Sequence, residues 1–391
     1  MRYSRILPRS RSVGKSVLRS AVQCLFVLAA VGARPVWADL FTGYKQAVGF
    51  DLPAGTAWFE PLPDGRILLI RNDEIWIESG VRSRSFSPLG TLPGADFPSF
   101  GAAFLRVSPG GEKLAVGNNG GSSFADYKVG IFDIATLTGN WFTADHYDAA
   151  WIDDIWLALS HGDFVNPSIV SALDTNSPNP ATPDIATLVV NIGGASAGVA
   201  FHSSGWLLTG NGFQSSGPSQ TGDVRAFAPA AWQAALLGGS PLDFEASGLP
   251  VTELLSASPL DFDAEGNLLI GGGDFSSVDD FDFVGVVHAS AVGAALLGGP
   301  VVDPNDSAAV RRLDPDAVNS FNFYAIARNN VTRELYVLDM SSDRVHVYVD
   351  GESIPAVSSW GLMNFSLLLL VATTLRLRTT HAPQTRVAIA L

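Results

Sequence analysis

Carboxylate side chains are the groups of this sequence whose spacing best suits chemistry. They occur in three short clusters, namely Asp279, Asp280 and Asp282, the pair Asp153 and Asp154, and the pair Asp261 and Asp263. Carboxylate oxygens are the ligands that Ca²⁺ prefers in proteins, although none of the clusters has EF-hand spacing. The preferred interpretation is a solvated acidic surface, because a strongly acidic chain needs exposed carboxylates for solubility. If a metal binds, we predict Ca²⁺ at Asp279, Asp280 and Asp282 or in a central channel.

The histidines, the paired serines and the glycine run indicate no catalytic site. The six histidines form no HExxH pair, so a zinc hydrolase has no support. The serines at 203–204 precede Gly205 and predict a turn. The run of glycines at 271–273 lacks the lysine of a phosphate-binding loop. The sequence therefore designates no catalytic residue.

Composition excludes several classes of protein. The 391 residues are 47% hydrophobic and carry a formal net charge of −14. Nucleic acid is excluded as a partner, because binding to phosphates needs a surplus of Lys and Arg. A single cysteine excludes a disulfide framework. The chain is too rich in apolar residues to be a disordered acidic protein.

The charge is unevenly distributed along the chain. Residues 1–38 hold seven basic residues and no acid, and residues 354–391 hold three basic residues and no acid. The central residues 39–353 therefore hold 14 basic residues against all 38 acids, a net charge of −24. The two ends differ in kind from the middle, and we expect different structures there.

One unit recurs through the middle: an apolar strand, a tight polar turn, a second apolar strand, a Gly/Asn/Ser stretch and a third strand. Its copies are 58–78, 103–133, a degraded one at 151–159, 199–208, 260–270 and 324–348. In the first copy, Asp64-Gly65 supplies the positive φ that a hairpin turn requires. The segment Ala-Ala-Leu-Leu-Gly-Gly at 234–239 recurs at 294–299 and predicts a short helix ended by glycine.

These repeats predict an all-β fold, a β-propeller of six blades with seven as the alternative, over residues 39–353. One small twisted sheet cannot bury its two apolar faces, so the copies pack around an axis and form a ring. The segment 334–348 resembles blades of the NHL and YVTN propeller group, in which a strand ending in Asp precedes an Arg-Val-x-Val-Tyr strand. Propellers of this kind host binding scaffolds, lactonases and sugar dehydrogenases, so the fold does not choose the function.

The N-terminus predicts a signal peptide over residues 1–38. A basic stretch precedes the apolar run 21–33, and small residues precede a cleavage point between Ala38 and Asp39. A membrane-anchoring helix is the alternative, although the run is too short to cross a bilayer. Cleavage there leaves a mature chain without cysteine, because Cys24 is the only one.

Near the C-terminus, the uncharged apolar run 360–375 predicts a single transmembrane helix stopped by Arg376 and Arg378, with a buried core helix as the alternative. A short motif precedes the run: Ile354, Pro355, Ala356, Val357, Ser358, Ser359, Trp360, Gly361 and Leu362. Motif, helix and arginines (354–378) resemble the IPTL type of the PEP-CTERM bacterial sorting signals. The resemblance implies export to the cell envelope or exterior and processing by an exosortase-type membrane protease. The arginine cluster is shorter than usual, and a tail (379–391) follows it.

Two functions are consistent with these features. The preferred one is an exported, envelope-associated or secreted propeller that presents a binding or structural surface, with its ligand undetermined. The alternative is a periplasmic or secreted enzyme of the lactonase or sugar-dehydrogenase type, with a metal or quinone in the channel. Carboxylates, Asn or His from several blades that converge at one mouth of the ring would favour the enzyme.

Overall fold

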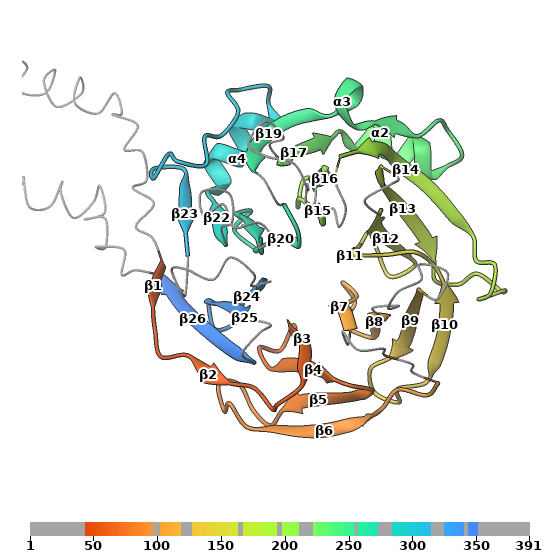
Figure 1. Ribbon diagram of the computed structural model, residues 1–391, viewed down its shortest axis with the longest axis vertical. Helices are drawn as coiled ribbons and strands as arrows, with labels where there is room; N and C mark the ends of the chain where they lie inside the picture. Colours follow the sequence, from red (N-terminus) through yellow and green to blue (C-terminus); the bar gives the residue numbers. More distant parts are fainter. Residues whose placement is uncertain are drawn as a thin grey trace, which may run out of the picture. The chain divides into compact units, whose positions relative to one another are not determined.

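Six antiparallel sheets surround a central axis and form a six-bladed β-propeller in the computed structural model (Figure 1). The structure describes residues 44–94, 97, 102–118, 127–162, 167–193, 198–210, 222–254, 257–272, 284–313, 324–339 and 343–350. The prediction of six blades is thereby confirmed. The predicted signal peptide, cleavage point, sorting motif, membrane helix and tail lie outside the described residues. Within the described residues, every helix is too short or too polar to span a bilayer.

The first three blades follow the chain from the innermost to the outermost strand. Blade 1 contains β3 (Thr56–Pro61), β4 (Ile67–Arg71), β5 (Glu74–Glu78) and β6 (Phe86–Thr91). Blade 2 contains β7 (Ala102–Val107), β8 (Lys113–Asn118), β9 (Lys128–Asp133) and β10 (Gly139–Thr143). Blade 3 contains β11 (Asp148–Trp151), β12 (Trp156–His161), β13 (Ser168–Asp174) and β14 (Ile185–Ile192), and β18 (Leu242–Asp243) pairs in parallel with its outer edge.

Blades 4 and 5 each carry a helical insertion before the outermost strand. Blade 4 contains β15 (Gly198–Phe201), β16 (Leu207–Gly210), β17 (Gly222–Phe227) and β19 (Leu249–Leu254), with α2 (Pro229–Leu236) and α3 (Phe244–Ser247) between the last two. Blade 5 contains β20 (Leu260–Phe262), β21 (Leu268–Ile270), β22 (Gly285–Val287), α4 (Ala289–Leu296) and β23 (Val310–Arg312).

Blade 6 joins the two ends of the ring. It contains β24 (Tyr324–Asn329), β25 (Glu334–Asp339) and β26 (Arg344–Asp350), and its outer strand is the N-terminal β1 (Tyr44–Gln46). The short β2 (Phe50–Asp51) pairs with β26 as well. Tyr44 lies directly opposite Asp350, so the first and last described residues are paired neighbours. Antiparallel pairing of the two chain ends thus closes the ring.

Packing between blades explains why the second strands read as continuous apolar runs. In β4, the residues from Ile67 to Ile70 are all buried. A middle strand packs against neighbouring blades on both faces, so both alternating sets of side chains avoid water. The innermost strands contact one another in order around the ring: β3, β7, β11, β15, β20, β24 and again β3.

The turns that the sequence predicts are present. Gly65 has φ of 88° in the β3–β4 turn, a conformation that disfavours a residue with a Cβ. Helices α2 and α4 each end in a Schellman motif, in which Gly239 donates its N–H to the Ala234 carbonyl and Gly299 donates to Ala294. The Ala-Ala-Leu-Leu-Gly-Gly segment is therefore the same helix end in two adjacent blades.

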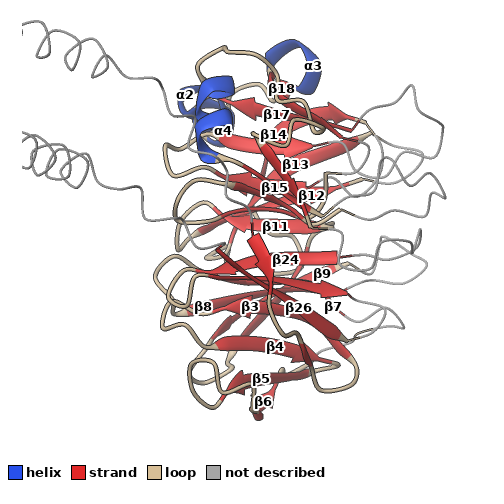
Figure 2. Ribbon diagram, turned by 90° about the vertical axis from the view of Figure 1, so that its left-hand side faces the viewer, coloured by secondary structure: helices blue, strands red, loops and turns tan. Residues whose placement is uncertain are grey.

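One face of the ring, called here the helix face, carries the first-to-second and third-to-fourth strand connections of every blade. Strands alternate in direction within each sheet, so these connections leave the blades at the same end. Helices α2 and α4 are third-to-fourth connections, and Figure 2 shows them together at one edge of the blades. Strand β26 is a third strand and ends on this face as well.

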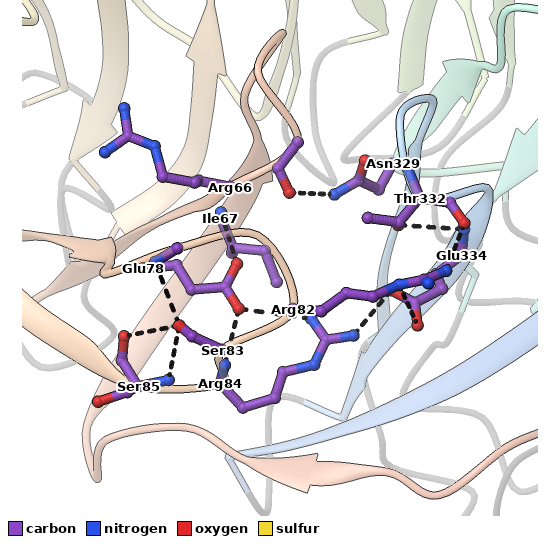
Figure 3. Close-up of polar contacts among 12 residues, drawn as sticks. Arg66, Ile67, Glu78, Arg82, Ser83, Arg84, Ser85, Asn329, Thr332 and Glu334 are labelled. Carbon is purple, nitrogen blue, oxygen red and sulfur yellow. Dashed lines mark hydrogen bonds and ion pairs between the residues drawn. The ribbon is translucent and has the colours of Figure 1, made fainter.

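Polar side chains hold blades 1 and 6 together next to this closure (Figure 3). Arg84 donates through Nη2 to Glu334 at 2.8 Å, and its N–H donates to Glu78 at 2.8 Å. The Tyr336 hydroxyl donates to the same Glu334 carboxylate at 2.6 Å. The Asn329 amide donates to the Gly65 carbonyl at 2.7 Å. Side chains thus reinforce the strand pairing where the two ends of the chain meet.

Replacing Arg84 with alanine tests this closure. The Arg84→Ala variant leaves the largely buried Glu334 with only the more exposed Arg82 as a cation. We therefore expect the free energy of unfolding to fall by about 1.5–3 kcal/mol in urea denaturation. Arg66→Ala is the matched control, because its ion pair with Asp64 is exposed on the surface and exposed pairs contribute less than about 1 kcal/mol. Equal losses in the two variants would show that the Arg84 contacts do not stabilise the closure.

Candidate functional site

Four charged side chains from four innermost strands meet at the centre of the ring. Glu60 comes from β3, Arg106 from β7, Asp148 from β11 and Asp261 from β20. Arg106 and Asp148 are buried, at 6% and 1% exposure. Glu60 and Asp261 are half-buried. Because innermost strands line the axis, one charged residue in each otherwise apolar strand is enough to build a polar centre.

The Asp148 carboxylate accepts four hydrogen bonds from protein donors. Its Oδ1 accepts from Arg106 Nη2 at 2.9 Å and from the Ala149 N–H at 2.9 Å. Its Oδ2 accepts from the N–H groups of Val199 and Leu260, each at 3.1 Å. A carboxylate has about four lone-pair sites, so protein donors occupy all of them. Asp148 therefore joins blade 3 to blades 2, 4 and 5.

Arg106 extends the same network to blade 1. Its Nε donates to the Ala149 carbonyl at 2.8 Å, and its Nη1 donates to Glu60 at 3.4 Å. Its guanidinium lies 5.7 Å from the centre of the Trp58 ring, a cation–π contact. Burial opposes the charge, but Asp148, Glu60 and Asp261 raise the pKa of Arg106 above its ordinary value. The buried cation is therefore stabilised by its acidic neighbours, with Asp148 contributing most.

Asp148 remains ionised in this network. Burial raises the pKa of its carboxyl, while Arg106 and the three backbone N–H groups oppose that rise. All four partners are donors, and an N–H group cannot accept the proton of a carboxylic acid. The ion pair with Arg106 thus requires the charged form of Asp148.

Glu60 and Asp261 have strongly perturbed acidity. Burial raises the pKa of Glu60 from 4.5 to about 8 against the charge of Arg106, and the nearby Asp261 adds to the rise. Burial likewise raises the pKa of Asp261 from 3.8 to about 6. Burial and the proximity of the two groups thus favour a proton on this pair. Carboxyl groups with raised pKa values at one site are an arrangement that acid–base chemistry uses.

A second polar group lies between blades 5 and 6. Asp263 accepts from the Asn267 N–H at 2.8 Å and from the Asn267 side-chain amide at 2.7 Å. The Arg328 guanidinium lies 3.6 Å from the same carboxylate and donates to the Tyr44 hydroxyl. Asp263 thus fixes the β20–β21 turn and contacts the neighbouring blade, while Asp261, within β20, belongs to the axial network.

The two acidic pairs that the structure describes are each divided between separate contacts. Asp279, Asp280 and Asp282 lie outside the described residues, and calcium binding there stays a prediction. Asp153 caps the β11–β12 turn by accepting from two N–H groups, and Asp154 accepts from the Gly110 N–H of blade 2 at 2.8 Å. Across the described ranges, no three His, Cys, Asp or Glu side chains are arranged to hold a metal ion.

Sequence reasoning missed Glu60, Arg106 and Asp148. Each is one charged residue in an innermost strand, as in Phe-Leu-Arg-Val around Arg106. The available signal was a single charged residue in an otherwise apolar strand. Burying a charge is costly without a partner, so such a residue indicates a buried polar contact. The partners themselves were not evident, since Leu260 is 112 positions from Asp148.

The fold and this centre define the chain as a six-bladed β-propeller protein. Neither known protein families nor characterised proteins match its sequence. Among solved structures it is similar to the carbohydrate-active enzyme of family AA12 from Trichoderma reesei, in its calcium structure, with 11% identity, a TM-score of 0.50 and coverage of 79% of this chain and 96% of that chain.

Two further structures are similar to it. The PQQ domain of pyranose dehydrogenase from Coprinopsis cinerea has 12% identity and a TM-score of 0.49, with 78% of this chain and 95% of that chain covered. The Cps50 (Swd1) β-propeller domain of Myceliophteria thermophila has 11% identity and a TM-score of 0.48, with 78% and 99% covered. Identities this low carry no functional assignment, and propellers serve many functions.

Removing the Asp148 charge tests its structural role. Asp148→Asn leaves the buried Arg106 without its nearest anion, so we expect the free energy of unfolding to fall by about 3–5 kcal/mol. Glu112→Gln, at an exposed acid in the β7–β8 turn, is the control, with an expected change within about 0.5 kcal/mol. Denaturant unfolding followed by tryptophan fluorescence measures both. A loss below 1 kcal/mol for Asp148→Asn, as for a surface residue, would contradict the role of the axial ion pair.

Glu60 gives the stability of the protein a characteristic pH dependence. Folding raises the pKa of Glu60. Between pH 4.5 and about 8, Glu60 is therefore protonated in the folded state and ionised in the unfolded state. The stabilisation of the folded state by this bound proton is complete below pH 4.5 and is lost as the pH rises to about 8. The Glu60→Gln side chain cannot titrate. In thermal unfolding, the melting temperature of this variant relative to that of the wild type should therefore rise from pH 5 to pH 8. Parallel curves for the two proteins would refute the shift.

Proposed function

We propose that the chain is an exported β-propeller of the cell envelope or exterior that presents a binding or structural surface. The observation that carries the proposal is the use of the axial Asp148, whose four acceptor sites are all taken by protein donors from four blades. This buried charged group at the centre of the ring thus stabilises the assembly of blades. A rigid closed ring suits a scaffold that offers its faces to partners.

The ends of the chain support the export part of this proposal. The described ring begins at Tyr44 and ends at Asp350, which are paired with each other. The predicted signal peptide before Asp39 and the sorting segment 354–378 therefore attach to the same blade. We propose that an exosortase-type protease recognises the 354–362 motif while the helix 360–375 lies in the membrane. The propeller sequence between them keeps its net charge of −24 in the mature protein.

Mass spectrometry of the mature termini, with cell fractionation, tests the sorting route. We expect an N-terminus at Asp39 and a C-terminus within or near 354–362, with the full-length precursor in the membrane fraction. Truncation after residue 353 should remove the membrane-bound form. Truncation after Arg378, which removes only the tail 379–391, is the matched control and should behave as the full chain. A mature chain that starts at Met1 and ends at Leu391 would contradict the proposal.

A second function is favoured by one observation, the perturbed pair Glu60 and Asp261. Strongly shifted pKa values in a half-buried site at the channel are typical of acid–base catalysts. This function is that of a periplasmic or secreted propeller enzyme of the lactonase or sugar-dehydrogenase type, with a metal or quinone in the channel. An enzyme of this type must turn over lactones, or sugars with a quinone acceptor. We expect Glu60→Gln to abolish that turnover. Equal turnover in Glu60→Gln and the wild type would exclude Glu60 as the acid.

A further inference from the structure

Exposed apolar side chains gather on the helix face. Among the described residues, nine large hydrophobic side chains are exposed, and seven of them lie in helix-face connections or at the strand residue that follows one: Val81, Ile155, Ile185, Leu237, Leu297, Val301 and Val331. The other two, Val48 and Leu89, belong to the outer rim of blades 6 and 1. Exposed apolar side chains concentrated on one face make that face a candidate site of interaction.

Leu237 and Leu297 are the most prominent members of this group. They are 87% and 90% exposed, and they occupy equivalent positions at the ends of α2 and α4. In both, the following glycine turns the chain back in a Schellman motif, so the leucine stands at the tip of the helix. The structure thus repeats one exposed leucine in two adjacent blades.

The segments that carry these two leucines are uncharged. Residues 226–242 and 285–302 contain no Asp, Glu, Lys or Arg, although the propeller sequence as a whole carries −24. The exposed residues that directly follow the two leucines are small, namely Gly, Ser and Pro. An apolar, uncharged tip can enter the interfacial region of a lipid bilayer without the cost of burying a charge.

The path of the chain brings the helix face toward the membrane. Strand β26 ends at Asp350 on this face, and the predicted membrane helix begins at Trp360. The nine residues between them span at most roughly 30 Å when fully extended. A tether this short keeps the helix face at a high effective concentration next to the bilayer.

We infer that the helix face docks on a lipid surface, with Leu237 and Leu297 inserted between the headgroups. The inference rests on the proposed membrane helix at 360–375. The acidic propeller is repelled by anionic lipids, so the expected surface is zwitterionic. The two helix tips then act together with the tether and orient the axis of the ring along the membrane normal.

Fluorescence quenching by brominated lipids tests this docking. The full chain with Cys24→Ser receives one new cysteine, as Leu237→Cys, Leu297→Cys or Val48→Cys, and each is labelled with an environment-sensitive dye. The labelled proteins are reconstituted into phosphatidylcholine vesicles with plain or brominated acyl chains. Val48 is the matched control, because it is apolar, 91% exposed and on the rim. We expect brominated lipid to reduce the emission at 237 and 297 and not at 48.

The outcomes separate the docking from the proposed function. Stable incorporation into vesicles without quenching at 237 and 297 overturns the docking and leaves the membrane helix standing. Equal quenching at all three positions also overturns it, since the ring then has no preferred face. Blue-shifted emission at 237 and 297 that is insensitive to bromine points to contact with a second protein copy and rejects a lipid partner. A chain that does not incorporate at all contradicts the membrane helix, and the inference falls with it.

Discussion

The ring depends on one buried carboxylate. Removing Asp148 from water is costly, and the cost is offset only when four donors surround it at hydrogen-bond distance. Those donors belong to β7, β11, β15 and β20, so satisfying one side chain fixes the relative positions of four blades. Arg106 extends the constraint to blade 1 through Glu60. Apolar packing alone specifies the relative positions of the blades less precisely, so the central charge sets this geometry.

Closure of the ring has a different physical basis. Backbone pairing of β1 with β26 joins residues that are separated by the whole length of the propeller, and Arg84, Glu334 and Tyr336 add charge-assisted hydrogen bonds beside it. One consequence is topological. Both ends of the described chain leave the same blade, and β26 ends on the helix face, where the exposed leucines of α2 and α4 also lie. The closure thus connects the fold to the location proposed for the protein.

The repeats were predictable because their signals are local. Apolar runs, the Asp64-Gly65 turn and the recurring Leu-Leu-Gly-Gly helix ends depend on neighbours within a few residues, and all of them appear in the structure. The axial site was not predictable, since it depends on contacts between innermost strands that are far apart in sequence. The sequence grouped Asp261 with Asp263 as an acidic pair, yet the fold places their carboxylates in different networks.

The sequence by itself determined a six-unit β-propeller, because strand periodicity and turn residues depend only on residues that are close together in the chain. The uneven charge distinguishes the two basic ends of the chain from its acidic middle, and these ends predict export. Tertiary structure alone decided which charged residues meet. Glu60, Arg106 and Asp148 occupy unremarkable positions in their own strands, and they form a site only because ring closure brings innermost strands to one axis, where low access to water makes each charge depend on its partners.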